Sequence, residues 1–191
     1  MHLMLTTSHA YWTWRALPAG RRRAAAVLGA AAPDLPALAL GTALALRGYG
    51  HRGLIGRVYR REPWRSVHRG GHSVLAPVAI AAAGLRRPAL RELAAGWGAH
   101  LAVDLATHHD DAWPPLWPLS RWRWRSPVSY WQRDHHAQLW RTAEALALIT
   151  AIAGDRQNAR RLGGVLALLA LLAPGWRRRI GYPRGAGRES S

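Results

Sequence analysis

The sequence predicts an all-α fold, a compact bundle of about six to eight helices joined by a long loop rich in proline and tryptophan. Apolar runs of helical length recur along the 191 residues, and short arginine-rich or proline-containing segments separate them. The length suffices for one domain with a substantial core. We expect a single helical domain over residues 1–180 and a disordered tail over 181–191.

The composition limits the chemistry that the chain can perform. Cysteine is absent, which excludes disulfides, thiolate metal sites and cysteine nucleophiles. All 27 basic residues are arginine, and the formal net charge is +17. The arginines lie in short clusters at the ends of apolar runs, and the chain has 11 tryptophans but no phenylalanine. This pattern favours a membrane protein with basic flanks, either embedded or peripheral; the alternative is a soluble helical protein with basic loops.

The first helix is expected to begin at the hydroxyl residues just before His9. Residues 24–46 form an apolar run long enough to span a bilayer, but Pro33 and Pro36 interrupt it. We therefore expect one helix to end near residue 32 and a second to begin at Pro36. Asp34 lies at this junction, either as the N-cap of the second helix or as a metal ligand.

A short amphipathic helix is expected over 54–61. The sequence His68-Arg69-Gly70-Gly71-His72-Ser73 follows and opens the apolar run 74–85. Glycines beside histidines at a helix start would let the backbone approach an ion or a phosphate. His51 and His68 themselves suit exposed positions.

The most informative stretch begins in the next helix, which we expect over 87–107 with Pro88 in its first turn. His100, Asp104 and His108 follow at intervals of four, and the residues between them are apolar. Such spacing puts imidazole and carboxylate on one face of a helix that otherwise points into a core. Buried groups of this kind are neutralised by a bound metal ion or by a His–Asp hydrogen-bonded pair that joins helices.

A long loop over 107–131 is expected to be functional. Within it, residues 121–125 alternate arginine and tryptophan, which suits a strand or an interfacial patch and only weakly a nucleic-acid stacking surface. His135 and His136 then stand at the start of a helix over 137–153, and a last apolar helix is expected over 159–172. At most one of these two histidines would share an ion with His100.

Motifs containing histidine and aspartate follow one another in a recognisable order over residues 5–120. The order is His9, Pro33-Asp34, His68-Arg69-Gly70, His72-Ser73, His100-x-x-x-Asp104-x-x-Thr107 and Leu116-Trp117-Pro118. In this order the sequence resembles the bacterial membrane-bound, metal-dependent hydrolases. Members are typically helical inner-membrane proteins, some are induced by DNA damage, and the family is distantly similar to zinc-dependent phospholipase C.

Two positions depart from the pattern of that family. The family usually has two residues between His-Arg-Gly and His-Ser, whereas Gly71 alone stands there in this chain. A second acid usually follows Pro-Asp, and Pro36 takes its place. Residues 126–136 resemble an actinobacterial branch, whose histidines would replace the missing ligand.

The resemblance implies a metal-dependent hydrolase in the bacterial inner membrane, integral or peripheral. The expected metal ligands are His9, Asp34, His72, His100 and Asp104. They would hold one or two divalent ions, most simply Zn²⁺, with Mn²⁺ or Fe²⁺ as alternatives. Metal-activated water would attack a small-molecule or lipid phosphoester, and nearby arginine would neutralise phosphate charge.

Five more residues are candidates for a second shell of contacts or for proton transfer: His108, Asp110, Asp111, His135 and His136. We expect Asp104, His108, Asp111 and His136 to act in catalysis. Two other functions stay open: a non-enzymatic membrane-associated protein with a structural or degenerate metal site, and a nucleic-acid binder, which lacks a recognition motif here. The sequence gives no oligomeric state.

Overall fold

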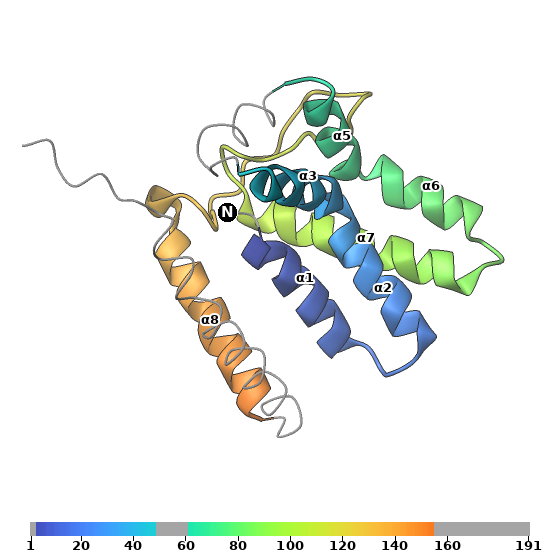
Figure 1. Ribbon diagram of the computed structural model, residues 1–191, viewed down its shortest axis with the longest axis horizontal. Coiled ribbons are helices and arrows are strands. Elements are labelled where there is room, and N and C mark those ends of the chain that lie inside the picture. The colour runs from blue at the N-terminus through green and yellow to red at the C-terminus, as the bar shows by residue number, and fades with distance from the viewer. Residues whose placement is uncertain (1–2, 49–60, 155–191) are drawn as a thin grey trace, which may run out of the picture. The chain divides into compact units, whose positions relative to one another are not determined.

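The computed structural model describes residues 3–48 and 61–154, and within these ranges it contains helices and no strand (Figure 1). The prediction of an all-α fold is therefore confirmed. The chain divides into two compact units, Met1–Ala137 and Gln138–Ser191. The predictions for His51, for 159–172 and for the tail lie outside the described residues, as does the helix expected over 54–61 apart from Arg61.

The N-terminal half of the first unit follows the break that the prolines predict. Helix α1 spans Leu3–Ala16, and α2 spans Arg21–Ala31. A 3-10 turn, η1, covers Ala32–Asp34 before α3 begins and runs over Leu35–Leu46. Pro33 has no N–H to continue the α-helical hydrogen bonds, so the chain tightens into a 3-10 turn at this point.

Helix α5 spans Trp64–Gly71, and α6 spans Leu75–Ala83. The glycines and histidines of the His-Arg-Gly-Gly-His run were expected to start a helix, and that prediction is wrong. They form the last turns of α5, and His72 is its C-cap. A Cβ on Gly71 would lie 3.1 Å from the carbonyl oxygen of Pro33, so this glycine lets α5 approach η1.

Helix α7, Pro88–Thr107, begins at the expected proline and packs mainly against α2. Two glycines permit this contact: a Cβ on Gly96 would overlap the backbone of Ala26, and one on Gly29 would overlap the backbone of Leu93. Ala26 and Ala30 are 1% and 0% exposed, so backbone meets backbone along much of the contact. The close approach fixes the end of α2 beside the middle of α7.

The loop after α7 is held at both of its sides. The Ser73 hydroxyl donates to the Trp117 carbonyl at 2.6 Å, and the Val74 N–H donates to the Pro115 carbonyl at 2.8 Å. On the other side, Ser126 and Tyr130 donate backbone N–H groups to His108 and Thr107 at 3.0 and 2.8 Å. These bonds satisfy carbonyls at the C-terminal end of α7 that have no helical partner.

A second 3-10 turn, η3, covers Arg133–His135, and α8 covers Ala137–Ala153, as expected from the sequence. Among the described residues, one helical stretch, Arg22–Leu46, is long and apolar enough to cross a membrane, with a mean hydropathy of 1.5. The core helices of soluble proteins and signal sequences are long and apolar in the same way. In this chain 28% of the most apolar part of the stretch is buried.

We predict that Gly96→Ala lowers the free energy of unfolding by about 1–3 kcal/mol, because the added methyl forces α2 and α7 apart. Gly98→Ala is the matched control, since a Cβ at Gly98 meets nothing within 4 Å in the same helix. That control is expected to gain up to about 1 kcal/mol from helix propensity. Urea unfolding of both variants checks this, and equal effects would contradict the close packing.

Candidate metal centre

The carboxylate of Asp104 lies at the centre of a cluster of imidazoles. Its Oδ1 is 3.4 Å from His9 Nε2, and its Oδ2 is 3.4 Å from His72 Nε2 and 3.2 Å from His100 Nε2. These side chains come from α1, from the C-cap of α5 and from α7. The Asp104 side chain is 14% exposed, and the three imidazoles are 5% or less.

Asp34 supplies a second carboxylate from η1. Its Oδ1 lies 3.5 Å from His72 Nε2 and its Oδ2 lies 4.0 Å from His100 Nε2. The hydroxyl of Thr6 donates to Oδ2 at 2.5 Å. Although Asp34 occupies the N-cap position of α3, its side chain makes no capping hydrogen bond. The structure thus directs this carboxylate to the histidines and away from the helix end.

Backbone carbonyls orient two of the imidazoles. Nδ1 of His100 lies 2.7 Å from the carbonyl oxygen of Ala30, and Nδ1 of His72 lies 2.9 Å from that of His68. Since a carbonyl only accepts, the ring proton is assigned to Nδ1 in each case. Nε2 then presents its lone pair to the carboxylates, which is how histidine ligands are commonly held.

Six residues form two groups that could each hold a metal ion: His9, His100 and Asp104 in the first, and Asp34, His68 and His72 in the second. In each group, one ligand atom from every residue lies within 4.8 Å of the others. The groups adjoin, because Asp104 of the first lies beside His72 of the second. The arrangement could hold one ion or two neighbouring ions.

The donor atoms themselves fit a cation. Nε2 of His9 and Nε2 of His100 are buried and make no hydrogen bond of acceptable geometry, although a carboxylate oxygen lies nearby. A buried donor or acceptor without a partner destabilises the fold. A divalent ion between imidazole and carboxylate would satisfy both groups at once.

The ionisation of the cluster reflects its mixed charges. Burial raises the pKa of Asp34, but His72, His100 and the Thr6 hydroxyl outweigh burial and lower it to about 2. Burial also raises the pKa of Asp104, and the imidazoles of His100 and His9 hold it well below its usual value. Both carboxylates are therefore ionised at neutral pH, as metal ligands must be.

His100 responds in the opposite direction. Burial lowers its pKa, but the adjacent Asp104 carboxylate, with Asp34 farther off, raises it above the ordinary value of 6.5. Without a bound cation, the surroundings of His100 therefore favour its protonated, positively charged form.

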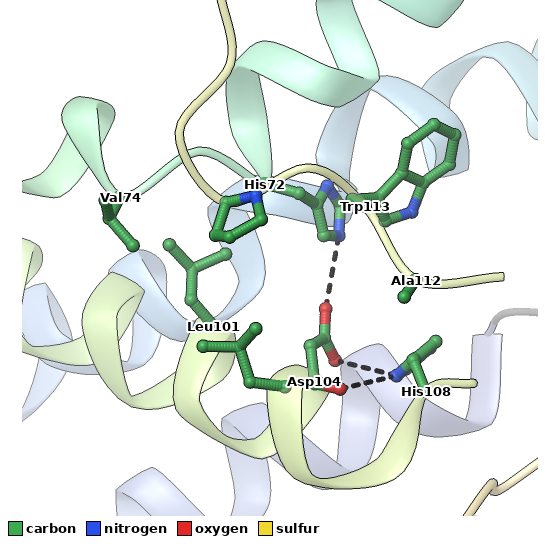
Figure 2. A pocket seen from close by; sticks show the side chains of 9 residues that line it. His72, Val74, Leu101, Asp104, His108, Ala112 and Trp113 are labelled. Carbon is green, nitrogen blue, oxygen red and sulfur yellow. Dashed lines mark hydrogen bonds and ion pairs between the residues drawn. The ribbon is translucent and has the colours of Figure 1, made fainter. Parts of the chain in front are cut away.

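A small, partly open cavity of about 20 Å³ adjoins the cluster (Figure 2). Its lining consists of His72, Val74, Leu101, Asp104, Leu105, His108, Ala112, Trp113 and Pro115. Most of these side chains are apolar. No arginine is among the described residues of the lining, so the expected arginine beside the substrate is not found there.

Two of the expected catalytic residues lie close together, and one of them, His108, lines this cavity. His108 Nε2 lies 3.7 Å from Asp111 Oδ2, and His108 Nδ1 lies 3.2 Å from the backbone carbonyl of Asp104. Figure 2 shows His108 beside Asp104 at the floor of the cavity. His108 is thus close to the cluster and borders the cavity, and Asp111 lies beside it.

The other candidates lie away from the cluster. Asp110 is exposed and lies 3.9 Å from Arg125, and His135 stacks on His109 with ring centroids 3.7 Å apart. His136 is exposed, with a left-handed backbone (φ 64°) after η3. The structure therefore does not bring these three residues to the centre.

Sequence reasoning missed three contributors. His68 was expected to suit an exposed position, and that prediction is wrong: it is buried, and its ring lies 4.3 Å from that of His72 and 4.6 Å from that of Trp113. Its spacing of four from His72 repeats that of His100 and Asp104 and could have revealed it. Thr6 was treated only as a helix cap, and Trp113 only as part of the loop.

A scan against protein-family models, a search of curated proteins and a search of solved structures each find no match to this chain.

We predict that the metal-free protein loses stability as the pH rises above about 6.5, the ordinary pKa of histidine. Because the pKa of His100 is raised on folding, its contribution is fully present below 6.5 and is lost as the pH passes the folded-state pKa. Urea unfolding in the presence of a chelator measures this. His100→Gln should flatten the dependence, and an unchanged slope in that variant would contradict the assignment.

Proposed function

We propose that this protein is a metal-dependent hydrolase whose two adjoining His/Asp groups hold divalent ions. The observation that carries the proposal is the pair of buried imidazole nitrogens, on His9 and His100, that face carboxylates without a hydrogen bond. Structural His–Asp pairs normally complete such bonds. A cation would complete the coordination of both groups.

Zinc suits the donor set best. Cysteine is absent, so the ligands are imidazole and carboxylate, which Zn²⁺ accepts readily and which Mn²⁺ or Fe²⁺ also tolerate. A bound ion of this kind lowers the pKa of a coordinated water and so supplies hydroxide at neutral pH. His9, His100 and Asp104 would bind one ion, and Asp34, His68 and His72 the other.

His108 is placed to move a proton during the reaction. It faces the cavity, and Asp111 lies on the side of its Nε2. We assign to Nε2 of His108 the transfer of a proton to the leaving oxygen of the substrate, with Asp111 beside this nitrogen as the group through which a proton returns from solvent. Asp104 would serve the metal and, through its backbone carbonyl, hold His108 in place.

The substrate class that we propose is a phosphodiester or a phospholipid. The small cavity beside the ligands is mostly apolar, with Leu101, Leu105 and Trp113 in its wall, so the uncharged portion of an ester would lie against its open mouth. Since the described lining has no arginine, neutralisation of the phosphate would fall to the bound ions.

We also propose that the chain is related to the bacterial membrane-bound, metal-dependent hydrolases and works at the inner membrane. The order of its motifs and the apolar stretch Arg22–Leu46 support this. That stretch is broken at η1, and Asp34 within it belongs to the buried cluster. We therefore place the protein on the membrane surface and not across it.

A second function uses the same cluster without catalysis: a membrane-associated protein whose ions are structural. The favouring observation is burial, since the three imidazoles around Asp104 are 5% exposed or less. Structural sites are closed, whereas catalytic ones keep a position open to substrate. The open cavity beside His72 and Asp104 favours the hydrolase.

We predict that the purified protein binds up to two equivalents of zinc, and that Asp104→Asn lowers the apparent zinc affinity by more than about 100-fold. Elemental analysis and competition with a chromogenic chelator measure this. His136→Ala is the control, because it removes an exposed imidazole of the same type. Zinc retention in Asp104→Asn equal to that of the wild type would exclude the site.

We predict that His108→Gln slows hydrolysis of bis(p-nitrophenyl) phosphate by about 10²- to 10⁴-fold while zinc content stays that of the wild type. The reason is that a proton donor is lost and the ligands are kept. Rates measured with zinc-loaded protein check this. A wild-type protein that holds zinc but hydrolyses neither this ester nor phospholipid would favour the structural function.

A further inference from the structure

The loop after α7 exposes an unusual amount of apolar surface at its tip. Leu119 is 79% exposed, Trp122 is 59% exposed and Trp124 is 48% exposed. Arg121, Arg123 and Arg125 alternate with the tryptophans and are exposed as well. We call residues 119–125 the Trp–Arg segment.

Packing within the described fold does not account for this segment. The loop is anchored on its two sides, through Trp117 before the segment and through Ser126 after it. A carboxylate oxygen of Asp110 lies 3.9 Å from the guanidinium of Arg125 at the end of the segment, and both of these side chains are 64% exposed. Two large indoles are thus held in water by a loop whose ends are fixed, and such surfaces mark interaction sites.

We infer that the Trp–Arg segment docks the protein on an anionic lipid surface. Tryptophan favours the boundary between headgroups and acyl chains, where its ring is half apolar and its N–H finds a partner. Arginine pairs with lipid phosphates, and juxtaposed basic residues add to binding at an anionic surface. The segment supplies both groups in alternation over five residues.

The aliphatic side chains at the segment favour a lipid surface over single-stranded nucleic acid, which would also bind to tryptophan and arginine. Leu119 is the most exposed of the large apolar side chains of the segment, and Leu116, 42% exposed, lies just before it. Bases stack on aromatic rings and gain little from leucine. Insertion of leucine beside tryptophan at the acyl boundary uses both kinds of side chain.

The loop that carries the segment also forms a wall of the cavity. Trp113 and Pro115 line the cavity, and the same loop is bonded to the junction of α5 and α6 through Ser73. The inference rests on the membrane-surface location proposed above and names the part of the chain that makes the contact. A docked loop would bring the candidate centre to the surface from which a lipid substrate is taken.

Vesicle flotation with the full-length protein tests the inference, using phosphatidylglycerol–phosphatidylcholine vesicles against pure phosphatidylcholine at low salt. Trp122→Ala with Trp124→Ala, and separately Arg121→Gln with Arg123→Gln, should each weaken partitioning to anionic vesicles at least about tenfold. Arg86→Gln with Arg87→Gln is the matched control, because it removes equal charge from the exposed turn between α6 and α7. The control should bind as the wild type does.

Zinc content and hydrolysis of soluble bis(p-nitrophenyl) phosphate, measured on the same variants, separate this inference from the proposed hydrolase. Both should be unchanged, since the substitutions lie outside the ligands and the cavity lining. The inference would be overturned if the wild-type protein did not bind anionic vesicles, or if the segment variants bound them as well as the control does. So would variants that lose binding to single-stranded DNA while keeping vesicle binding.

Discussion

The rest of the structure depends on the burial of one carboxylate. Asp104 lies inside a helical core, 14% exposed, and an unpaired charge in such a place would be strongly destabilising. Three imidazole nitrogens, from α1, α5 and α7, lie within 3.4 Å of its oxygens, and the carboxylate raises the pKa of one of these groups, His100. Contacts between carboxylate and imidazole thus join these helices at their centre, where most helical bundles have aliphatic packing. A divalent ion would serve the same purpose without requiring protonated histidine.

The surrounding fold prepares the cluster through small residues and backbone carbonyls. Gly29 and Gly96 bring α2 against α7, and this approach places the Ala30 carbonyl where it orients His100. Pro33 in the 3-10 turn has no N–H to donate to the Ala30 carbonyl, and this carbonyl accepts from the imidazole of His100. The same turn turns Asp34 toward His72. Pro33, which interrupts the apolar run, therefore also helps to form the candidate metal centre.

Helices and their limits could be predicted where the residues act locally. Pro33 marks the break between α2 and α3, and Pro88 begins α7. The cluster could be predicted in part, because spacing placed His100 and Asp104 on one face. For His68 the spacing of four from His72 was the only local signal, and its burial against Trp113 from a distant loop could not be predicted. No feature of the sequence around His136 shows whether its imidazole is exposed or buried, because tertiary packing alone determines this.

X-ray absorption at the zinc edge of the loaded protein tests the central claim most directly. The arrangement of His9, His100 and Asp104 beside Asp34, His68 and His72 predicts nitrogen and oxygen ligands at about 2.0–2.1 Å with clear imidazole scattering. With both groups filled, a second metal should appear at about 3.5–4 Å. A spectrum of hydrated zinc with oxygen neighbours alone, unchanged in the His100→Ala variant, would contradict the account and leave the cluster as a set of buried His–Asp pairs.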